Sequence, residues 1–189
     1  MSFLQMPTPA AARRLFLGKS GLMLSGAAVA LLAGNDVLAA KSGGATGNDV
    51  QILNTALGAE LEAIAAYQLG AESKLLEKAV LDLALTFQGH HKEHADLLAK
   101  TVAKLGGKPA TTKGKYDFPV EQLKSQADVL KFAARLEQGA VSAYLGAVPL
   151  FGERDLAKAA ASILGDEAMH WAVLRQAVGQ APVPSAFVS

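Results

Sequence analysis

Apolar residues recur at intervals of three and four along four segments of the chain, the spacing that places side chains on one face of an α-helix. We therefore predict helices over residues 48–70, 73–106, 120–147 and 153–178. Glycine or proline stands where these helices should end, at Gly106, Gly107, Pro149 and Gly179. Runs of β-branched and aromatic residues with alternating polarity are almost absent, so the sequence predicts an all-α fold.

The connections between the predicted helices limit the topology. The first and second helices, like the third and fourth, are joined by a few residues, so each pair should form an antiparallel hairpin. Residues 106–119 between the hairpins can extend over about 46 Å, whereas a 28-residue helix is about 42 Å long. This length permits, without requiring, a four-helix bundle of two hairpins joined by one long crossover.

Each predicted helix has an acid or a histidine near the middle of its apolar stripe. These residues are Glu60, His91, His94, Glu137, Glu167 and His170. One such residue usually lies at the solvated edge of a stripe, and a lone histidine is usually a satisfied core residue. Four coincident cases are different, because burying unpaired charges costs several kcal/mol each, against a domain stability of about 5–15 kcal/mol. Divalent cations would neutralise such a layer, since they bind carboxylate and imidazole together.

An internal repeat supports this interpretation. At offsets of 76 and 77 residues the two helix pairs match, with Glu60 on Glu137, Tyr67 on Tyr144, His94 on His170 and His91 on Glu167. All four histidines, His90 included, lie within the repeated segments. The candidate ligands therefore occupy equivalent positions in two copies of a two-helix unit.

The amino-acid composition limits the kinds of functional site that the chain can form. The chain has no Cys, which excludes thiolate metal sites, iron–sulfur clusters, disulfides and cysteine nucleophiles. A net charge of +1, from 18 Lys plus Arg and 17 Asp plus Glu, does not favour a nucleic-acid-binding surface. Any metal must be held by His and carboxylates. Hydrolysis at a zinc site stays open, although no nucleophile stands in a recognisable setting.

Residues 1–40 have the layout of an export signal, with basic residues before the apolar run 21–34. Residues 13–17, Arg-Arg-Leu-Phe-Leu, resemble the bacterial twin-arginine signal, although Ala12 replaces its Ser/Thr and Lys19 stands one place late. An uncleaved membrane anchor is the alternative, but about 14 apolar residues fall short of the roughly 20 that span a bilayer.

We expect cleavage after Ala39 or Ala40, and a periplasmic or otherwise exported protein in a bacterium. The chain then divides into a signal peptide (1–40), a flexible linker (41–47), a helical domain (48–180) and a tail (181–189). The mature form, with 15 Lys plus Arg against 16 Asp plus Glu, should not span the membrane.

Three segments, 52–57, 136–147 and 163–170, resemble bacterial and often exported ferritin-like domain proteins. The likeness extends over nearly all of residues 48–180. It implies a ferritin-like four-helix bundle, in which two helices give one Glu each and two give a Glu-x-x-His to a di-iron or di-manganese centre.

Carried over by position, the resemblance implies six metal ligands: Glu60, His91, His94, Glu137, Glu167 and His170. The departure is His91, where the family pattern has Glu. Three carboxylates leave two divalent ions with a net charge of +1, which should favour a mononuclear or zinc-like site over a bridged pair. His90, within one turn of His94, could take the place of His91.

Four residues are candidates to support the ligands: Tyr67, Tyr144, Asp166 and His90. Asp166 precedes Glu167, as the superfamily's supporting acid often does, and suits the orientation of an imidazole across the bundle. The tyrosines are expected either to donate hydrogen bonds near the ligands or to fill the core.

The resemblance implies a metal-binding redox protein with iron or manganese, and zinc as a third choice, that reacts with dioxygen or peroxide. Ferroxidase, peroxidase and catalase-like activities fit it equally. The alternative is a structural or stress-protection bundle that binds metal weakly or not at all. Iron storage is a weaker hypothesis, because no acidic nucleation cluster is evident. The expected partners are the twin-arginine export machinery and a small oxidant; assembly into a homo-oligomer stays open.

Overall fold

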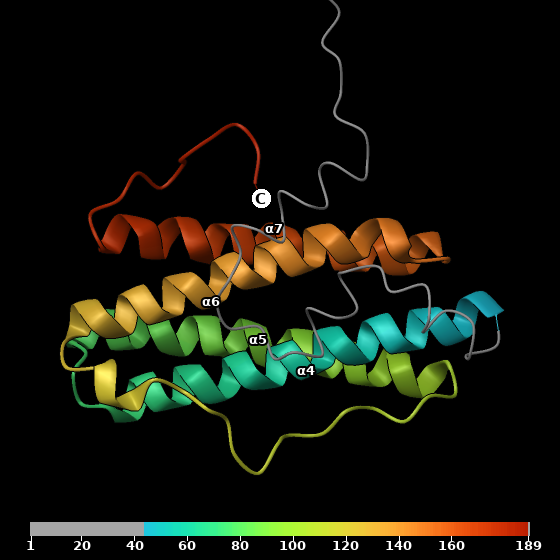
Figure 1. Ribbon diagram of the computed structural model, residues 1–189, viewed down its shortest axis with the longest axis horizontal. Helices are drawn as coiled ribbons and strands as arrows, with labels where there is room; N and C mark the ends of the chain where they lie inside the picture. The colour runs from blue at the N-terminus through green and yellow to red at the C-terminus, as the bar shows by residue number, and fades with distance from the viewer. Residues whose placement is uncertain (1–43, 189) are drawn as a thin grey trace, which may run out of the picture.

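The computed structural model describes residues 44–188, which fold into four long helices (Figure 1). These are α4 (Gly44–Glu72), α5 (Lys78–Lys104), α6 (Gln126–Ala147) and α7 (Arg154–Ala177). Two short 3₁₀ turns, η1 (Val120–Gln122) and η2 (Val148–Leu150), precede α6 and α7. No strand occurs in this part of the chain, so the all-α prediction is confirmed. The predicted signal peptide lies outside the described residues.

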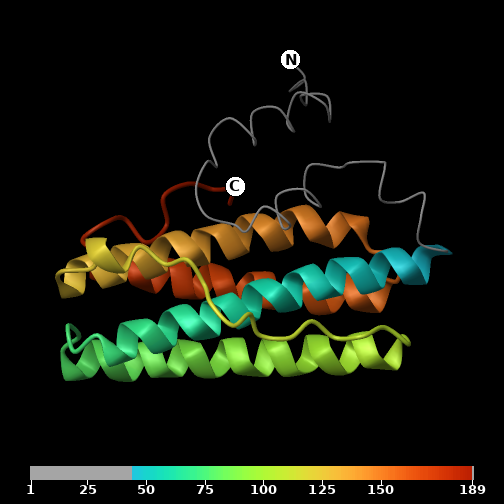
Figure 2. The same cartoon turned by 60° about the horizontal axis from the view of Figure 1, so that its bottom comes forward.

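The helices form two hairpins that pack into one bundle. Helix α4 packs mainly against α5, and α6 packs mainly against α7. The crossover from α5 to α6 runs along the bundle from one end to the other (Figure 2). Two hairpins joined by a long crossover are therefore confirmed.

Three predicted helix boundaries were wrong by several residues. Helix α4 begins at Gly44, so residues 44–47 of the predicted linker are helical. Helix α5 begins at Lys78 rather than near residue 73. Helix α6 begins at Gln126, because the Ser125 side chain accepts a hydrogen bond from the Asp128 N–H and caps the first turn. The crossover is correspondingly longer than predicted.

The core consists of two apolar clusters separated along the bundle by a polar layer. One cluster is built on Leu53, Leu57, Leu98, Val102 and Ile163. The other is built on Tyr67, Phe87, Leu130, Trp171 and Leu174. On every helix the candidate ligands fall between the residues of the two clusters, so apolar packing holds the polar layer from both sides.

Asp49 ties the start of α4 to the start of α7. It is fully buried, and its carboxylate accepts hydrogen bonds from the backbone N–H groups of Gly152 at 2.8 Å and Glu153 at 3.2 Å. Glu153, the residue before α7, makes no capping bond with its own side chain. Asp49 therefore supplies the acceptor that a helix N-terminus needs, from the opposite hairpin.

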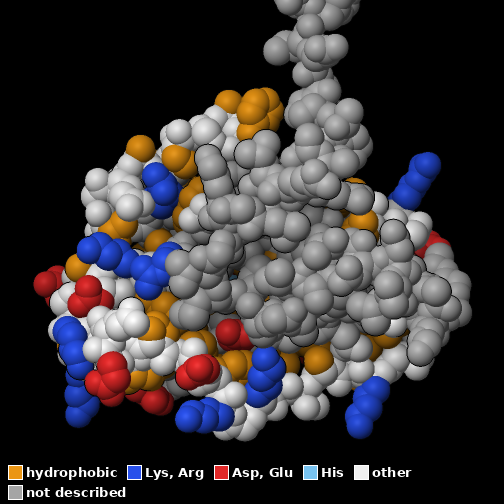
Figure 3. All heavy atoms as spheres, viewed as in Figure 1, with side chains coloured by type: hydrophobic (Ala, Val, Ile, Leu, Met, Phe, Trp, Pro, Cys, Tyr) orange, Lys and Arg blue, Asp and Glu red, His pale blue; other side chains and the backbone are white. Residues whose placement is uncertain are grey.

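Charged side chains of both signs are interspersed on the part of the surface that Figure 3 shows. Some form ion pairs along a helix, such as Lys78 with Asp82 at 2.7 Å. Within residues 44–188, no helix combines the length and the apolar character that crossing a bilayer requires.

Candidate metal centre

The polar layer draws side chains from all four helices. Glu60 comes from α4, His91 and His94 from α5, Glu137 from α6, and Glu167 and His170 from α7. All are at most 2% exposed apart from His94, whose side chain is 14% exposed. This burial confirms the prediction that these residues face inward. Each lies on the same helical stripe as the apolar core residues of its helix, which is why it points to the interior.

Two groups of potential metal ligands overlap in this layer. The first group comprises Glu60, His91, His94 and Glu167; the second comprises His91, Glu137, Glu167 and His170. Within each group the ligand atoms lie within 4.8 Å of one another. His91 and Glu167 belong to both groups, so the layer offers two adjacent positions for ions that share two residues.

In the first group, carboxylate oxygens face the Nδ1 atoms of two histidines. Glu60 Oε2 lies 2.8 Å from His91 Nδ1 and 3.6 Å from His94 Nδ1. Glu167 Oε1 lies 3.1 Å from His94 Nδ1 and 3.6 Å from His91 Nδ1. Four ligand atoms thus converge from three helices.

In the second group, Glu137 takes the place of Glu60. Its Oε1 lies 3.2 Å from His91 Nε2 and 3.5 Å from His170 Nδ1. Glu167 Oε2 lies 3.6 Å from the same His170 nitrogen. His91 therefore turns one ring nitrogen to each group, and Glu167 turns one oxygen to each.

Several atoms in the layer are buried without a hydrogen-bond partner among the described residues. They are His94 Nδ1, His170 Nδ1, Glu137 Oε2 and both carboxylate oxygens of Glu167. Buried polar atoms are nearly always satisfied, and leaving one unsatisfied costs about 1–3 kcal/mol, more when it is charged. Carboxylate oxygens and imidazole nitrogens are ligands for iron, manganese and zinc. The residues present therefore fit a pair of divalent ions.

Two tyrosines hold the carboxylates in place. The Tyr144 hydroxyl donates to Glu60 Oε1 at 2.6 Å, and the Tyr67 hydroxyl donates to Glu137 Oε1. Each tyrosine is buried, and each reaches the glutamate of the other hairpin. These bonds occupy one oxygen of each carboxylate and fix its orientation toward the centre.

Asp166 contacts three imidazoles through one oxygen. Its Oδ2 lies 3.2 Å from His170 Nε2, 3.4 Å from His94 Nε2 and 3.2 Å from His90 Nδ1. Contact at Nε2 leaves the Nδ1 atoms of His94 and His170 directed at the centre, the arrangement by which supporting carboxylates orient metal-binding histidines. The side chain of His90 is 40% exposed, so His91 rather than His90 lies in the buried layer.

The carboxylates raise the pKa values of the buried histidines. Burial lowers the pKa of His91, but hydrogen bonds to Glu137 and Glu60 outweigh it and raise the value to about 11. Burial likewise opposes the nearby carboxylates at His94 and His170, whose pKa values rise to about 9. Burial also acts on Glu137, yet its histidine partners lower its pKa. Without metal, protons on the imidazoles neutralise the layer, so protons and metal ions compete for the same nitrogens.

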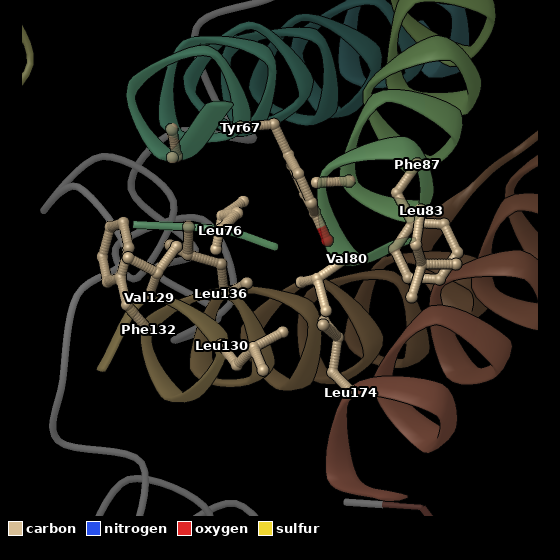
Figure 4. Close-up of a pocket in the computed structure, with 14 residues that line it drawn as sticks. Tyr67, Leu76, Val80, Leu83, Phe87, Val129, Leu130, Phe132, Leu136 and Leu174 are labelled. Atoms are coloured by element: carbon tan, nitrogen blue, oxygen red, sulfur yellow. The ribbon is translucent and has the colours of Figure 1, made fainter. Parts of the chain in front are cut away.

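An apolar cavity of about 30 Å³ adjoins the polar layer. Figure 4 shows Tyr67 and Phe87 together with aliphatic side chains from α5, α6 and α7 around it. Tyr67 hydrogen-bonds Glu137, and the Phe87 ring stacks on His170 with a centroid distance of 4.0 Å. The cavity is thus separated from two candidate ligands by single side chains.

Fold and site together define a helical bundle whose interior can hold metal through carboxylates and imidazoles. Residues 48–180 match the ferritin-like domain family, and the chain belongs to this family. None of the curated proteins matches the chain.

Two solved structures share the fold. One is a conserved hypothetical protein, rv2844, from Mycobacterium tuberculosis, with a TM-score of 0.66, 23% identity, and coverage of 76% of this chain and 99% of that one. The other is described as ferritin-like, diiron-carboxylate proteins from Bacillus anthracis str. Ames, with a TM-score of 0.62 and 19% identity. The match covers 71% of this chain and 97% of the Bacillus anthracis chain. The ferritin-like fold is therefore established.

Proposed function

We propose that this protein binds two divalent metal ions, iron or manganese before zinc, and reacts with dioxygen or peroxide. Iron oxidation or oxidative-stress defence would be its role. The observation that carries the proposal is the set of buried carboxylate and imidazole atoms that lack partners in two overlapping groups. The diiron-carboxylate description of the Bacillus anthracis structure supports the same class of chemistry.

The six ligands divide between the two positions according to their contacts. Glu60 and His94 would hold one ion, Glu137 and His170 the other, and Glu167 would give one oxygen to each. His91 lies between the positions and can ligate either ion. When bound there, a redox-active metal would supply the electrons that reduce dioxygen or peroxide.

The protein's own residues would prepare the site for that chemistry. Tyr67 and Tyr144 hold the carboxylates, and Asp166 sets the orientation of two imidazoles. The two apolar clusters exclude bulk water, which strengthens electrostatic interactions inside the layer. The apolar cavity beside Tyr67 and Phe87 suits a small, weakly polar oxidant such as dioxygen.

Location in the bacterial envelope is part of the proposal. It rests on the basic residues and apolar run of residues 1–40, which lie outside the described structure. A twin-arginine route, which carries folded proteins, would let the bundle acquire its metal before export. The proposed leader would be cleaved near Ala39 or Ala40.

Metal analysis of the purified protein tests the metal centre. Anaerobic loading with Fe²⁺ or Mn²⁺, followed by elemental analysis, should give two ions per chain. His170→Ala, which removes a ligand of the second buried group, should lose at least one ion, and both His170→Ala and Glu137→Ala should slow the consumption of peroxide or dioxygen. A wild-type protein that retains no transition metal under these conditions contradicts the proposal.

One observation favours a second candidate, a stress-protection bundle that works without metal. His91 lies within 3.2 Å of both Glu60 and Glu137, so a protonated imidazole can donate one hydrogen bond to each carboxylate without a metal ion. In that case, alanine at all six ligand positions should leave the melting temperature unchanged or raise it, since buried charge is removed. A large fall in melting temperature together with loss of metal rules this candidate out.

A further inference from the structure

A third group of potential ligands lies beside the buried layer and nearer the surface. It comprises His90 of α5 with Asp166 and His170 of α7, whose ligand atoms lie within 4.8 Å of one another. His90 is not among the six proposed ligands of the buried layer, and Asp166 contacts that layer only by orienting imidazoles. The side chains of His90 and Asp166 are 40% and 22% exposed, so solvent reaches this group.

The three ligand atoms form a compact triangle. His90 Nδ1 lies 2.9 Å from His170 Nε2, and Asp166 Oδ2 lies 3.2 Å from each of these nitrogens. With bonds of about 2.1 Å, adjacent ligands of an octahedral ion lie about 3.0 Å apart, and those of a tetrahedral ion about 3.4 Å apart. The triangle therefore has the size of one octahedral face. Two imidazoles and one carboxylate on such a face are typical ligands of Fe²⁺.

His170 belongs both to this triangle and to the second buried group. Its Nε2 faces His90 and Asp166, whereas its Nδ1 lies 3.5 Å from Glu137 Oε1. A neutral imidazole has one nitrogen free to bind a metal, because the other carries the proton. His170 can therefore ligate an outer ion or a buried ion, but one at a time.

We propose that His90, Asp166 and His170 form an outer metal site, which takes up a divalent cation from solvent before the buried group of Glu137 and His170 is filled. This inference rests on the proposed function, because the buried group is the destination of the ion. Once the ion is bound at Nδ1 of His170, the ring proton lies on Nε2, where Asp166 can accept it in a hydrogen bond. Asp166 thus serves the outer ion first and the orientation of His170 afterwards.

Removal of the buried competitor isolates the outer site. Glu137→Ala deletes a carboxylate of the second buried group and leaves His170 free for the outer ion. In titration calorimetry with Co²⁺, which binds such ligands more tightly than Fe²⁺, Glu137→Ala should bind one more ion per chain than Glu137→Ala/His90→Ala. Equal stoichiometry and affinity in these two variants overturn the proposal.

The rate of loading tests the same site with the buried ligands intact. Stopped-flow mixing of metal-free protein with Co²⁺ should show uptake at least fivefold slower in His90→Ala than in wild type, with the same final stoichiometry. Glu93→Ala is the matched control, because Glu93 is an exposed carboxylate on α5 outside all three groups. It should load at the wild-type rate. Equal rates for His90→Ala and wild type overturn the proposal.

Failure of the proposed function would look different. If the buried layer binds no metal, Glu60→Ala and wild type bind the same number of Co²⁺ ions, since Glu60 belongs to the first buried group alone. The comparison of Glu137→Ala with Glu137→Ala/His90→Ala still reports on the outer site in that case. The two proposals can therefore fail separately.

Discussion

A single imidazole gives the buried layer two ways to balance its charge. His91 lies 2.8 Å from Glu60 and 3.2 Å from Glu137, so when protonated it satisfies both carboxylates. When neutral, it has one nitrogen for a metal ion and one proton for a carboxylate. The glutamate of the family pattern would add a fourth negative charge here and would need metal or further protons to neutralise it. His91 thus allows the layer to exist in a metal-free and a metal-bound form.

The tyrosine hydroxyls should matter in both forms. Tyr144→Phe removes the donor to Glu60 and leaves a buried oxygen unsatisfied. We expect about 1.5–3 kcal/mol less stability in urea unfolding of the metal-free protein, and about 10- to 100-fold weaker metal binding in calorimetry. Tyr116→Phe is the control, because Tyr116 lies on the crossover away from the centre. Equal losses in both variants contradict this role for Tyr144.

At the level of elements, two helix starts depend on side chains from different parts of the chain. Helix α6 is capped locally, since the Ser125 hydroxyl accepts the Asp128 N–H and the Asp128 carboxylate accepts the Lys124 N–H. This reciprocal pattern is a recognised start signal, and it explains why α6 begins later than the apolar stripe suggests. Helix α7 is capped from afar by Asp49, which only the packing of the hairpins brings there.

Asp49 should therefore contribute to stability without contributing to metal binding. Asp49→Ala leaves the N–H groups of Gly152 and Glu153 without their acceptor, so we expect a loss of about 1–3 kcal/mol in urea unfolding. Asp49→Asn, which keeps one acceptor oxygen, should lose less. Metal stoichiometry should stay at the wild-type value in both. A loss below about 0.5 kcal/mol in the alanine variant would contradict this role.

For the whole molecule, the polar layer divides the core and couples the two hairpins. Every carboxylate in the layer contacts a group on another helix, and the tyrosine bonds cross between the hairpins. The layer is thus part of the interface that joins α4 and α5 to α6 and α7. Its charge state should affect the unfolding of the entire domain.

Metal-free and metal-bound protein should respond to pH in opposite directions. Without metal, the raised pKa values of His91, His94 and His170 stabilise the fold fully below about pH 6.5, the unfolded value; this stabilisation declines above that pH and is lost as pH rises through about 9 for His94 and His170 and about 11 for His91. Metal binding needs deprotonated imidazoles and strengthens over the same range. We expect the melting temperature of the metal-free protein to fall between pH 6.5 and 9, while the increase caused by Mn²⁺ grows.

Calorimetric melting in matched buffers, with and without chelator, measures both trends. His91→Ala, which removes the histidine with the largest rise, should flatten the pH dependence of the metal-free protein. Parallel curves for the two forms would show that the imidazoles do not bind the metal.

The sequence predicted most of the fold and the inward positions of the candidate ligands. Glu60, Glu137 and Glu167 could be identified because each interrupts an apolar stripe of known period, and the repeat paired Glu60 with Glu137 and His94 with His170. The start of α6 could not be placed from that period, because the cap that Ser125 provides, rather than hydrophobicity, decides where its first turn begins.

The sequence did not predict which side chains contact one another across the bundle. It left open whether Tyr67 and Tyr144 donate hydrogen bonds near the ligands or fill the core, and it did not indicate that each reaches the glutamate of the opposite hairpin. It indicated that Asp166 can orient an imidazole, but not that one oxygen contacts His90, His94 and His170. The role of Asp49 also had no local signal, because its partners lie more than a hundred residues away.

The sequence by itself therefore determined the all-α class, the two hairpins and the residues that face the interior. The periodicity of a helix fixes the direction of each side chain about that helix's own axis. Only the tertiary structure decided which side chains meet, and so how the polar residues divide into two buried groups and one outer group. The reason is that the rotation and axial offset between helices are set by the packing of the apolar clusters on both sides of the polar layer.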